Sequence, residues 1–113
     1  MCKKRSRWGL LVLSAVLTLA SGAYADETVY ELTLKEHRFS PPELKIPANK
    51  RVKIVVFNQD AAAEEFESFD LNREKVVSGN GKILLFIGPL KPGVYKYFGE
   101  FNPKTAQGIV IAE

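Results

Sequence analysis

The stretch that decides the fold is residues 95–111, which read YKYFGEFNPKTAQGIVI. Aromatic and polar residues alternate in its first part, as in a β-strand with one buried face. A polar loop containing Asn102 and Pro103 follows, and Gly108 then leads into an apolar run. The stretch therefore predicts two strands joined by a polar loop.

The rest of the chain repeats this pattern of short strands separated by Pro, Gly, Asn and Asp. We expect strands over residues 28–35, 43–46, 51–57, 64–69, 82–87, 94–98 and 108–112, whereas residues 70–77 fit either a turn or a strand. Pro41 and Pro42 are expected to end pairing after the first strand, because proline has no N–H to donate. No segment has sustained helical periodicity. The prediction is an all-β sandwich or small barrel of seven or eight strands.

The aromatic residues of the second half lie at near-alternate spacing. In a β-rich chain this spacing is typical of side chains that fill a core. We expect most of the following to be buried: Phe66, Phe69, Phe86, Tyr95, Tyr97, Phe98 and Phe101.

Residues 1–25 are typical of a secretory signal peptide. Four basic residues precede an apolar run over residues 8–20, and Ala23-Tyr24-Ala25 supplies the small residues of a cleavage site. We expect cleavage after Ala25, export to the periplasm and a soluble mature domain over residues 26–113. The alternative is an uncleaved anchor, but the apolar run is shorter than the ~20 residues that a membrane span needs.

Removal of this leader changes the charge of the chain. Residues 26–113 hold twelve basic and thirteen acidic residues, a formal net charge of −1, so nucleic acid is not an expected partner. The single cysteine, Cys2, also lies in the leader. The mature domain therefore has no disulfide and no thiolate, and a blue-copper centre, which requires a cysteine thiolate, is excluded.

Four segments occur in an order that resembles the cupredoxins, and specifically the secreted, single-domain EfeO-type cupredoxin-like proteins. The resemblance implies a Greek-key β-sandwich over residues 26–113, with any metal site at one end. The segment at residues 90–97 is the most specific of the four. The segments are FSPPELKIPA (39–48), VKIVVFN (52–58), EFES (65–68) and LKPGVYKY (90–97).

The same resemblance implies where copper ligands would stand. Copper-binding members have a histidine just before the EFES segment, where this chain has Glu64, and their Cys, second His and Met fall near Gly99, Asn102 and Gln107. All four positions depart from the copper pattern. Gln107 could serve only as an axial ligand, and Asn102 could instead tie the loop together by hydrogen bonds.

A metal site built from oxygen and imidazole ligands instead of a thiolate is the remaining alternative. The one histidine of the mature chain, His37, lies in a loop that the resemblance brings to the same end of the sandwich, and Glu65 and Glu74 add to the carboxylates within reach. One His with carboxylates suits Fe(II), Mn(II) or Zn(II), and can take Cu(II). Alternation places Glu65 and Glu67 on the face opposite Glu64, which favours Glu64. The alternative is that these are ordinary solvated residues. The predicted metal ligands are His37, Glu64, Glu100, Glu67 and Gln107.

The resemblance implies a periplasmic metal-handling accessory protein that binds Fe(II) or Cu(II) and is associated with bacterial iron uptake. Its expected partners are the metal ion and a membrane iron-transport complex or a periplasmic iron-binding protein. No hydrolase or transferase constellation is visible, so assistance to ferrous iron oxidation is the one enzymatic role considered. The alternative is a metal-free interaction module that binds a protein in the cell envelope through Phe98, Phe101 and Pro103.

Overall fold

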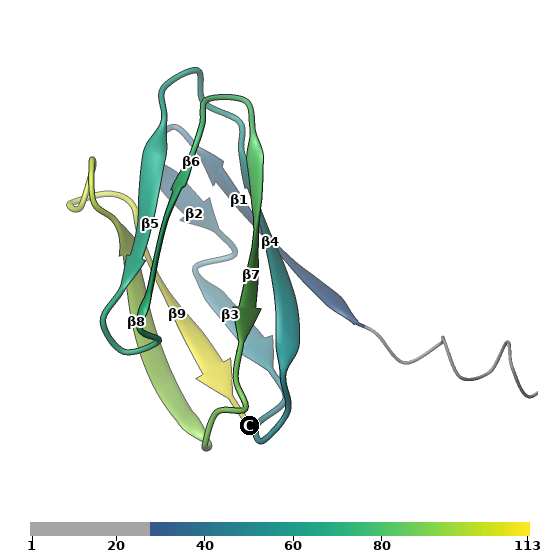
Figure 1. Cartoon of the computed structure of the whole chain (residues 1–113). Coiled ribbons are helices and arrows are strands. Elements are labelled where there is room, and N and C mark those ends of the chain that lie inside the picture. The colour runs from purple at the N-terminus through teal and green to yellow at the C-terminus, as the bar shows by residue number, and fades with distance from the viewer. Residues whose placement is uncertain (1–27) are drawn as a thin grey trace, which may run out of the picture.

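The computed structural model describes residues 28–113, which fold into two β-sheets packed face to face (Figure 1). The predicted all-β sandwich is confirmed. The predicted signal peptide lies outside the described residues. Within residues 28–113 there is no helix long and apolar enough to cross a membrane. The strands are β1 (Val29–Lys35), β2 (Arg38–Ser40), β3 (Glu43–Ile46), β4 (Val52–Asn58), β5 (Glu64–Ser68), β6 (Arg73–Val77), β7 (Lys82–Ile87), β8 (Gly93–Gly99) and β9 (Gln107–Ala112).

The two sheets differ in strand order. The four-stranded sheet has the order β2-β1-β4-β7, and the five-stranded sheet has the order β3-β9-β8-β5-β6. Two pairs are parallel, β1 with β4 and β3 with β9, and the others are antiparallel. The last strand, β9, therefore lies inside the five-stranded sheet between β3 and β8.

Two strands make the described part of the chain nine-stranded rather than seven- or eight-stranded. β2 forms directly before Pro41, because Phe39 pairs with Leu34 and buries its ring, which is 5% exposed. β6, over residues that fit either a turn or a strand, pairs with β5 along its whole length. Four of its five residues are exposed, so it has no buried alternation that the sequence could reveal.

The core is centred on three aromatic rings from both sheets. Tyr97 stacks on Phe66 at 5.1 Å between ring centroids, and Phe39 meets both rings edge-on. The prediction that most of the seven aromatic residues are buried is wrong, because only Phe66 and Tyr97 lie in the core. Tyr95 is half-buried against the core, and the other four side chains stand on outward positions of strands or in loops, where exposure reaches 78% for Phe69.

Candidate functional site

A buried carboxylate occupies the loop end of the five-stranded sheet. Glu64 begins β5, points inward and is 1% exposed. Its Oε1 accepts hydrogen bonds from the backbone N–H groups of Phe101, at 2.8 Å, and Glu65, at 2.9 Å, while its Oε2 accepts one from Asn102 Nδ2 at 2.9 Å. Burial of a carboxylate is tolerated when its oxygens are paired in this way. Glu64 therefore ties the loop after β8 to the start of β5.

Gly99 lies directly against this carboxylate. A Cβ atom at Gly99 would be 2.6 Å from Glu64 Cδ and 2.7 Å from Ala106 Cβ, so a side chain does not fit there without movement. The Gly99 N–H donates to the Ala106 carbonyl at 2.8 Å, which brings the two ends of the loop together. Glu64, Gly99 and Asn102, three of the four positions at which the resemblance implied copper ligands, thus meet at one place.

The groups at this place do not fit a type 1 copper centre. Gly99 offers no side chain, Asn102 donates through its amide, and both oxygens of Glu64 already accept hydrogen bonds. These three hydrogen bonds, and the burial of Glu64, set its carboxylate to accept from protein donors. The prediction that Asn102 ties the loop by hydrogen bonds is confirmed.

His37 makes its contacts elsewhere. It lies in the turn between β1 and β2, its side chain is 48% exposed, and its Nδ1 is 3.8 Å from Asp60 Oδ2. The backbone N–H groups of Glu36 and His37 also donate to the Asp60 carboxylate, at 2.7 and 3.0 Å. The hydrogen bond from the His37 backbone is the main cause that lowers the pKa of Asp60. The structure thus places His37 with Asp60, and groups neither residue with Glu64 or Glu100.

Two further predicted ligands, Glu100 and Gln107, are exposed. The Glu100 side chain lies on the surface, while its backbone N–H donates to the Glu65 carbonyl at 2.9 Å. Gln107 Nε2 donates to the Pro103 carbonyl at 2.9 Å, which holds the loop from its other side.

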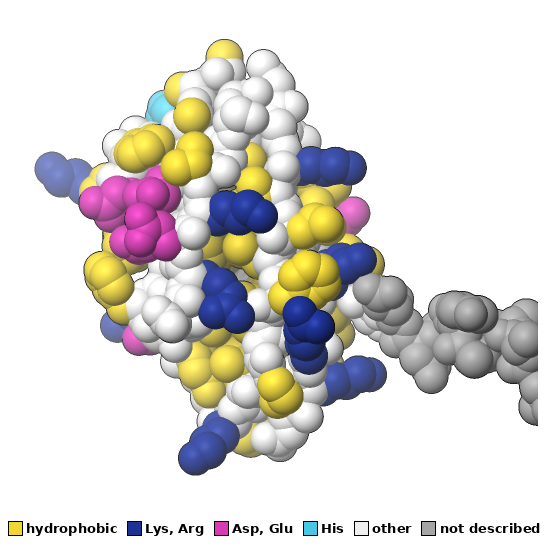
Figure 2. Space-filling model, in the orientation of Figure 1, with side chains coloured by type: hydrophobic (Ala, Val, Ile, Leu, Met, Phe, Trp, Pro, Cys, Tyr) yellow, Lys and Arg dark blue, Asp and Glu magenta, His cyan; other side chains and the backbone are white. Residues whose placement is uncertain are grey.

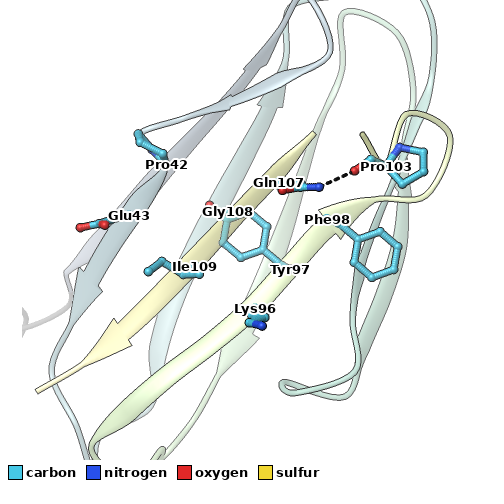
Figure 3. Close-up of a pocket in the computed structure, with 9 residues that line it drawn as sticks. All are labelled: Pro42, Glu43, Lys96, Tyr97, Phe98, Pro103, Gln107, Gly108 and Ile109. Atoms are coloured by element: carbon cyan, nitrogen blue, oxygen red, sulfur yellow. Dashed lines mark hydrogen bonds between the residues drawn. The ribbon is translucent and has the colours of Figure 1, made fainter. Parts of the chain in front are cut away.

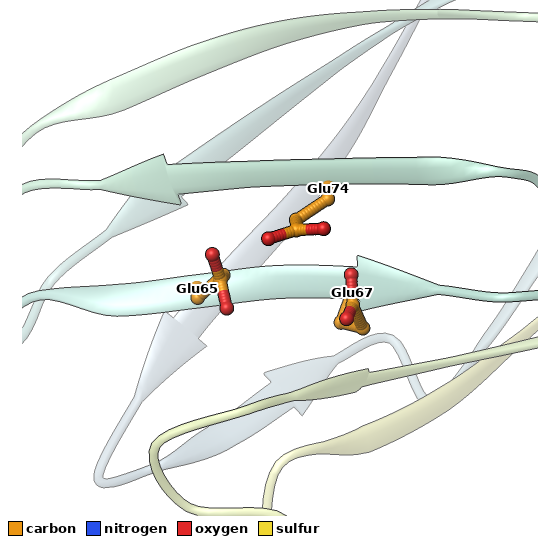
Figure 4. Close-up of side chains that lie close together, drawn as sticks. All are labelled: Glu65, Glu67 and Glu74. Atoms are coloured by element: carbon orange, nitrogen blue, oxygen red, sulfur yellow. The ribbon is translucent and has the colours of Figure 1, made fainter.

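Within residues 28–113, three acidic side chains converge as a group: Glu65, Glu67 and Glu74 each offer one oxygen, and these atoms all lie within 4.8 Å of one another (Figure 4). Glu65 and Glu67 share the outer face of β5, as alternation predicted, and Glu67 pairs in register with Glu74 of β6. The sequence contained no signal for that register, so the grouping of Glu74 with Glu65 and Glu67 could not be predicted from it.

These carboxylates repel one another. Loss of hydration, followed by the proximity of Glu74, raises the pKa of Glu65 and of Glu67, and the charge of Glu100 adds to both shifts. Figure 2 shows the acidic side chains gathered over β5 with hydrophobic side chains on either side. A proton or another cation would relieve this repulsion.

The proteins to which this chain is similar agree with the observed architecture. The sequence pattern of the family described as "Cupredoxin-like domain" matches residues 9–112. An uncharacterized protein of Rickettsia prowazekii is 42% identical over 81 residues, which cover 72% of this chain and 65% of that protein. The chain thus spans just under two thirds of this relative.

Solved structures of copper proteins share the fold. Auracyanin A, a "blue" copper protein of Chloroflexus aurantiacus, has a TM-score of 0.66 at 15% identity and covers 78% of this chain and all of its own. The purple cupredoxin of Nitrosopumilus maritimus has a TM-score of 0.58 at 20% identity, over 74% of this chain and 99% of its own. Amicyanin of Paracoccus versutus has a TM-score of 0.59 at 21% identity, over 79% and 83%. At these identities the likeness shows the fold alone.

Proposed function

Because the chain belongs to the family of cupredoxin-like domains, we propose that it is a metal-handling accessory protein of the periplasm that binds Fe(II) or Cu(II) and serves bacterial iron uptake. A cupredoxin-like domain fits a metal-related role. The resemblance of four segments to EfeO-type proteins supports the link to iron, with a membrane iron-transport complex or a periplasmic iron-binding protein as partner.

The observation that carries the proposal is the convergence of Glu65, Glu67 and Glu74 within 4.8 Å. Carboxylate oxygens suit hard divalent cations and do not favour Cu(I). Bound at this exposed place, the ion is cargo that exchanges with solution. Glu67 is the one member of the predicted ligand set that belongs to this group.

Electron transfer through type 1 copper is not part of the proposal. The corresponding end of the sandwich is filled by the Glu64 carboxylate and its three hydrogen-bond donors. The described residues also include no cysteine.

Calorimetric titration of the purified protein with Fe(II) under anaerobic conditions, and with Cu(II) and Zn(II), tests the proposal. We expect Glu67→Gln to weaken binding at least tenfold (about 1.4 kcal/mol), while His37→Ala and the exposed control Glu31→Gln leave it unchanged. Absence of binding tighter than about 10 μM, near 7 kcal/mol of affinity, would contradict the proposal. Loss of binding in His37→Ala alone would contradict the assignment to the carboxylates.

A metal-free interaction module is the second candidate. The closed arrangement around Glu64 favours it, together with the exposure of Phe101, which is 54% accessible in the loop that Glu64 holds. In this case a partner would be captured equally well in the presence of a chelator. Capture that survives the chelator and fails with Phe101→Ala would support the module, whereas capture that requires metal would count against it.

A further inference from the structure

A groove of about 680 Å³ runs over the outer face of the five-stranded sheet. Its walls come from β3, β8 and β9 and from the loop after β8 (Figure 3). The apolar part is formed by Pro42, Phe98, Pro103 and Ile109, and the Gln107 amide lies among them, held by the Pro103 carbonyl. Such a mixture of apolar walls and a few fixed polar groups is typical of a binding surface.

The apolar surface continues beyond the groove. Phe98 lies 5.7 Å from Phe69 between ring centroids, and Phe69 is 78% exposed. Two aromatic side chains therefore cover the outer face between the groove and the turn after β5. A contiguous apolar surface of this kind on a small domain marks a place of interaction.

The acidic cluster borders this surface on one side. Phe98 pairs in register with Gln107 on β9 and with Glu67 on β5, and Glu67 pairs with Glu74 on β6. Register partners on neighbouring strands share one face of the sheet. The groove and the three carboxylates are therefore neighbours on one continuous surface.

The basic residues nearest in sequence do not neutralise these carboxylates. The Arg73 guanidinium donates to the Phe86 carbonyl at 2.9 Å, and Lys75 Nζ donates to the Leu84 carbonyl at 3.5 Å, so both β6 side chains reach toward β7. Lys96 borders the groove two residues before Phe98 on β8, and no ion pair joins it to these carboxylates among residues 28–113. The negative charge beside Phe98 is thus complementary to a cation from another molecule.

We propose that this outer face docks an extended segment of a protein partner, with an apolar side chain in the groove and a Lys or Arg side chain on Glu65, Glu67 and Glu74. Adjacent strands are about 4.8 Å apart, so the acidic cluster lies roughly 7 to 10 Å across the sheet from the middle of the groove. An extended segment rises about 3.3 Å per residue. Because successive side chains of an extended segment point to opposite faces, the apolar and the basic residue stand two positions apart in the partner.

The proposal goes beyond metal handling and is tested without metal. The probe is a terminally blocked peptide, Thr-Leu-Thr-Arg-Thr, titrated into the isotope-labelled protein in a chelating buffer and followed by NMR. We expect shifts of backbone amides around Phe98, Ile109 and Glu67. Replacement of the peptide's Arg by Glu, or of its Leu by Ser, is expected to weaken binding at least tenfold.

Matched variants separate the two parts of the surface. The double variant Glu67→Gln, Glu74→Gln is expected to weaken binding of the Arg peptide at least fivefold, and Glu31→Gln, an exposed glutamate of the other sheet, to leave it unchanged. Phe98→Ala is expected to weaken binding of both Arg- and Glu-containing peptides, with Phe86→Ala as the control. Circular dichroism establishes that each variant is folded, and the glutamate variants keep the test valid if Phe98→Ala does not fold.

Three results would overturn the proposal. One is equal affinity for the Arg and Glu peptides, and another is a set of shifts outside this face. The third is self-association that Phe98→Ala abolishes, without peptide binding, which would assign the surface to a second copy of the chain. Since the titration excludes metal, a failure of metal binding leaves the docking proposal standing, and a failure of peptide binding leaves the metal proposal standing.

Discussion

At the scale of single residues, the loop end of the sandwich depends on one carboxylate. Glu64 is buried where a copper-binding cupredoxin is expected to have a histidine, and it meets N–H donors instead of a metal. The side chain joins β5 to the loop as a metal ion would, but through hydrogen bonds. Removal of one hydrogen bond to a charged group typically lowers the free energy of unfolding by about 1.5 to 3 kcal/mol.

Glu64→Gln is expected to destabilise the fold by about 2 to 3 kcal/mol, because the amide brings an N–H₂ group toward donors that need acceptors. Urea unfolding monitored by circular dichroism measures this change. Glu31→Gln, with the same change of charge at an exposed position, should shift stability by no more than about 0.5 kcal/mol. Equal effects of the two substitutions would show that the Glu64 hydrogen bonds contribute nothing specific.

Gly99→Ala tests the space beside the carboxylate. The new Cβ would lie 2.6 Å from Glu64 Cδ and 2.7 Å from Ala106 Cβ, so the loop must move, at an expected cost of about 1 to 3 kcal/mol. Gly93→Ala is the matched control, because the nearest atom to its Cβ would be 3.7 Å away. Thermal unfolding of the two variants should separate them clearly, and a Gly99→Ala protein as stable as Gly93→Ala would contradict the packing described for the loop.

At the scale of elements, the pair β5–β6 places like charges together. Loss of hydration and then the proximity of Glu74 raise the pKa values of Glu65 and Glu67, so Glu74→Gln is expected to lower both toward the ordinary glutamate value of 4.5. NMR titration of the side-chain carboxyl carbons measures the change. Lys82→Gln, at an exposed position of β7, serves as a control that should leave both pKa values in place.

The sign of the accompanying pH dependence follows from the raised values. In the folded protein Glu65 and Glu67 bind protons more tightly than in the unfolded chain, so they favour the folded state below the ordinary carboxyl pKa. That contribution is lost as the pH rises through the raised pKa values. In Glu74→Gln the loss should be smaller, and an unchanged pH profile would contradict the repulsion inferred between the two strands.

The strands themselves differ in how far the sequence predicts them. β4 and β8 alternate or carry dense β-branched residues, and they were predicted within a residue or two of their bounds. β2 is three residues long and ends at a proline, and β6 is largely exposed, so both form through pairing with a neighbour. The local sequence pattern indicates which residues are buried and where turns occur, but it does not indicate the register in which strands pair.

At the scale of the whole molecule, we expect the stability of the fold to be independent of a bound metal. The closure of the loop end by Glu64 and the core of Phe39, Phe66 and Tyr97 involve protein groups alone. Treatment with a chelator is therefore expected to leave the melting temperature unchanged within about 1 °C, whereas saturating Fe(II) would raise it through binding to the folded state. A large fall on chelation, measured by calorimetry, would place a structural ion in the domain.

The candidate site could be predicted from the sequence to the same extent as the strands. Alternation correctly set Glu64 apart from Glu65 and Glu67, and the turn chemistry around Asn102 correctly indicated a hydrogen-bonding role. The partners of these residues depend on the path of a loop and on the pairing of β5 with β6. The loop path and the strand pairing follow from long-range packing, which cannot be inferred from a single sequence.

The position of β9 affects the order of events during synthesis. Residues 107–112 are made after all the other strands, yet they lie between β3 and β8, and without them β3 has no partner in its sheet. A nascent chain therefore cannot complete the five-stranded sheet until these residues have left the ribosome tunnel. The last strand to be synthesised is therefore the one that closes this sheet, and its pairing with β3 and β8 is a late step in the folding of the domain.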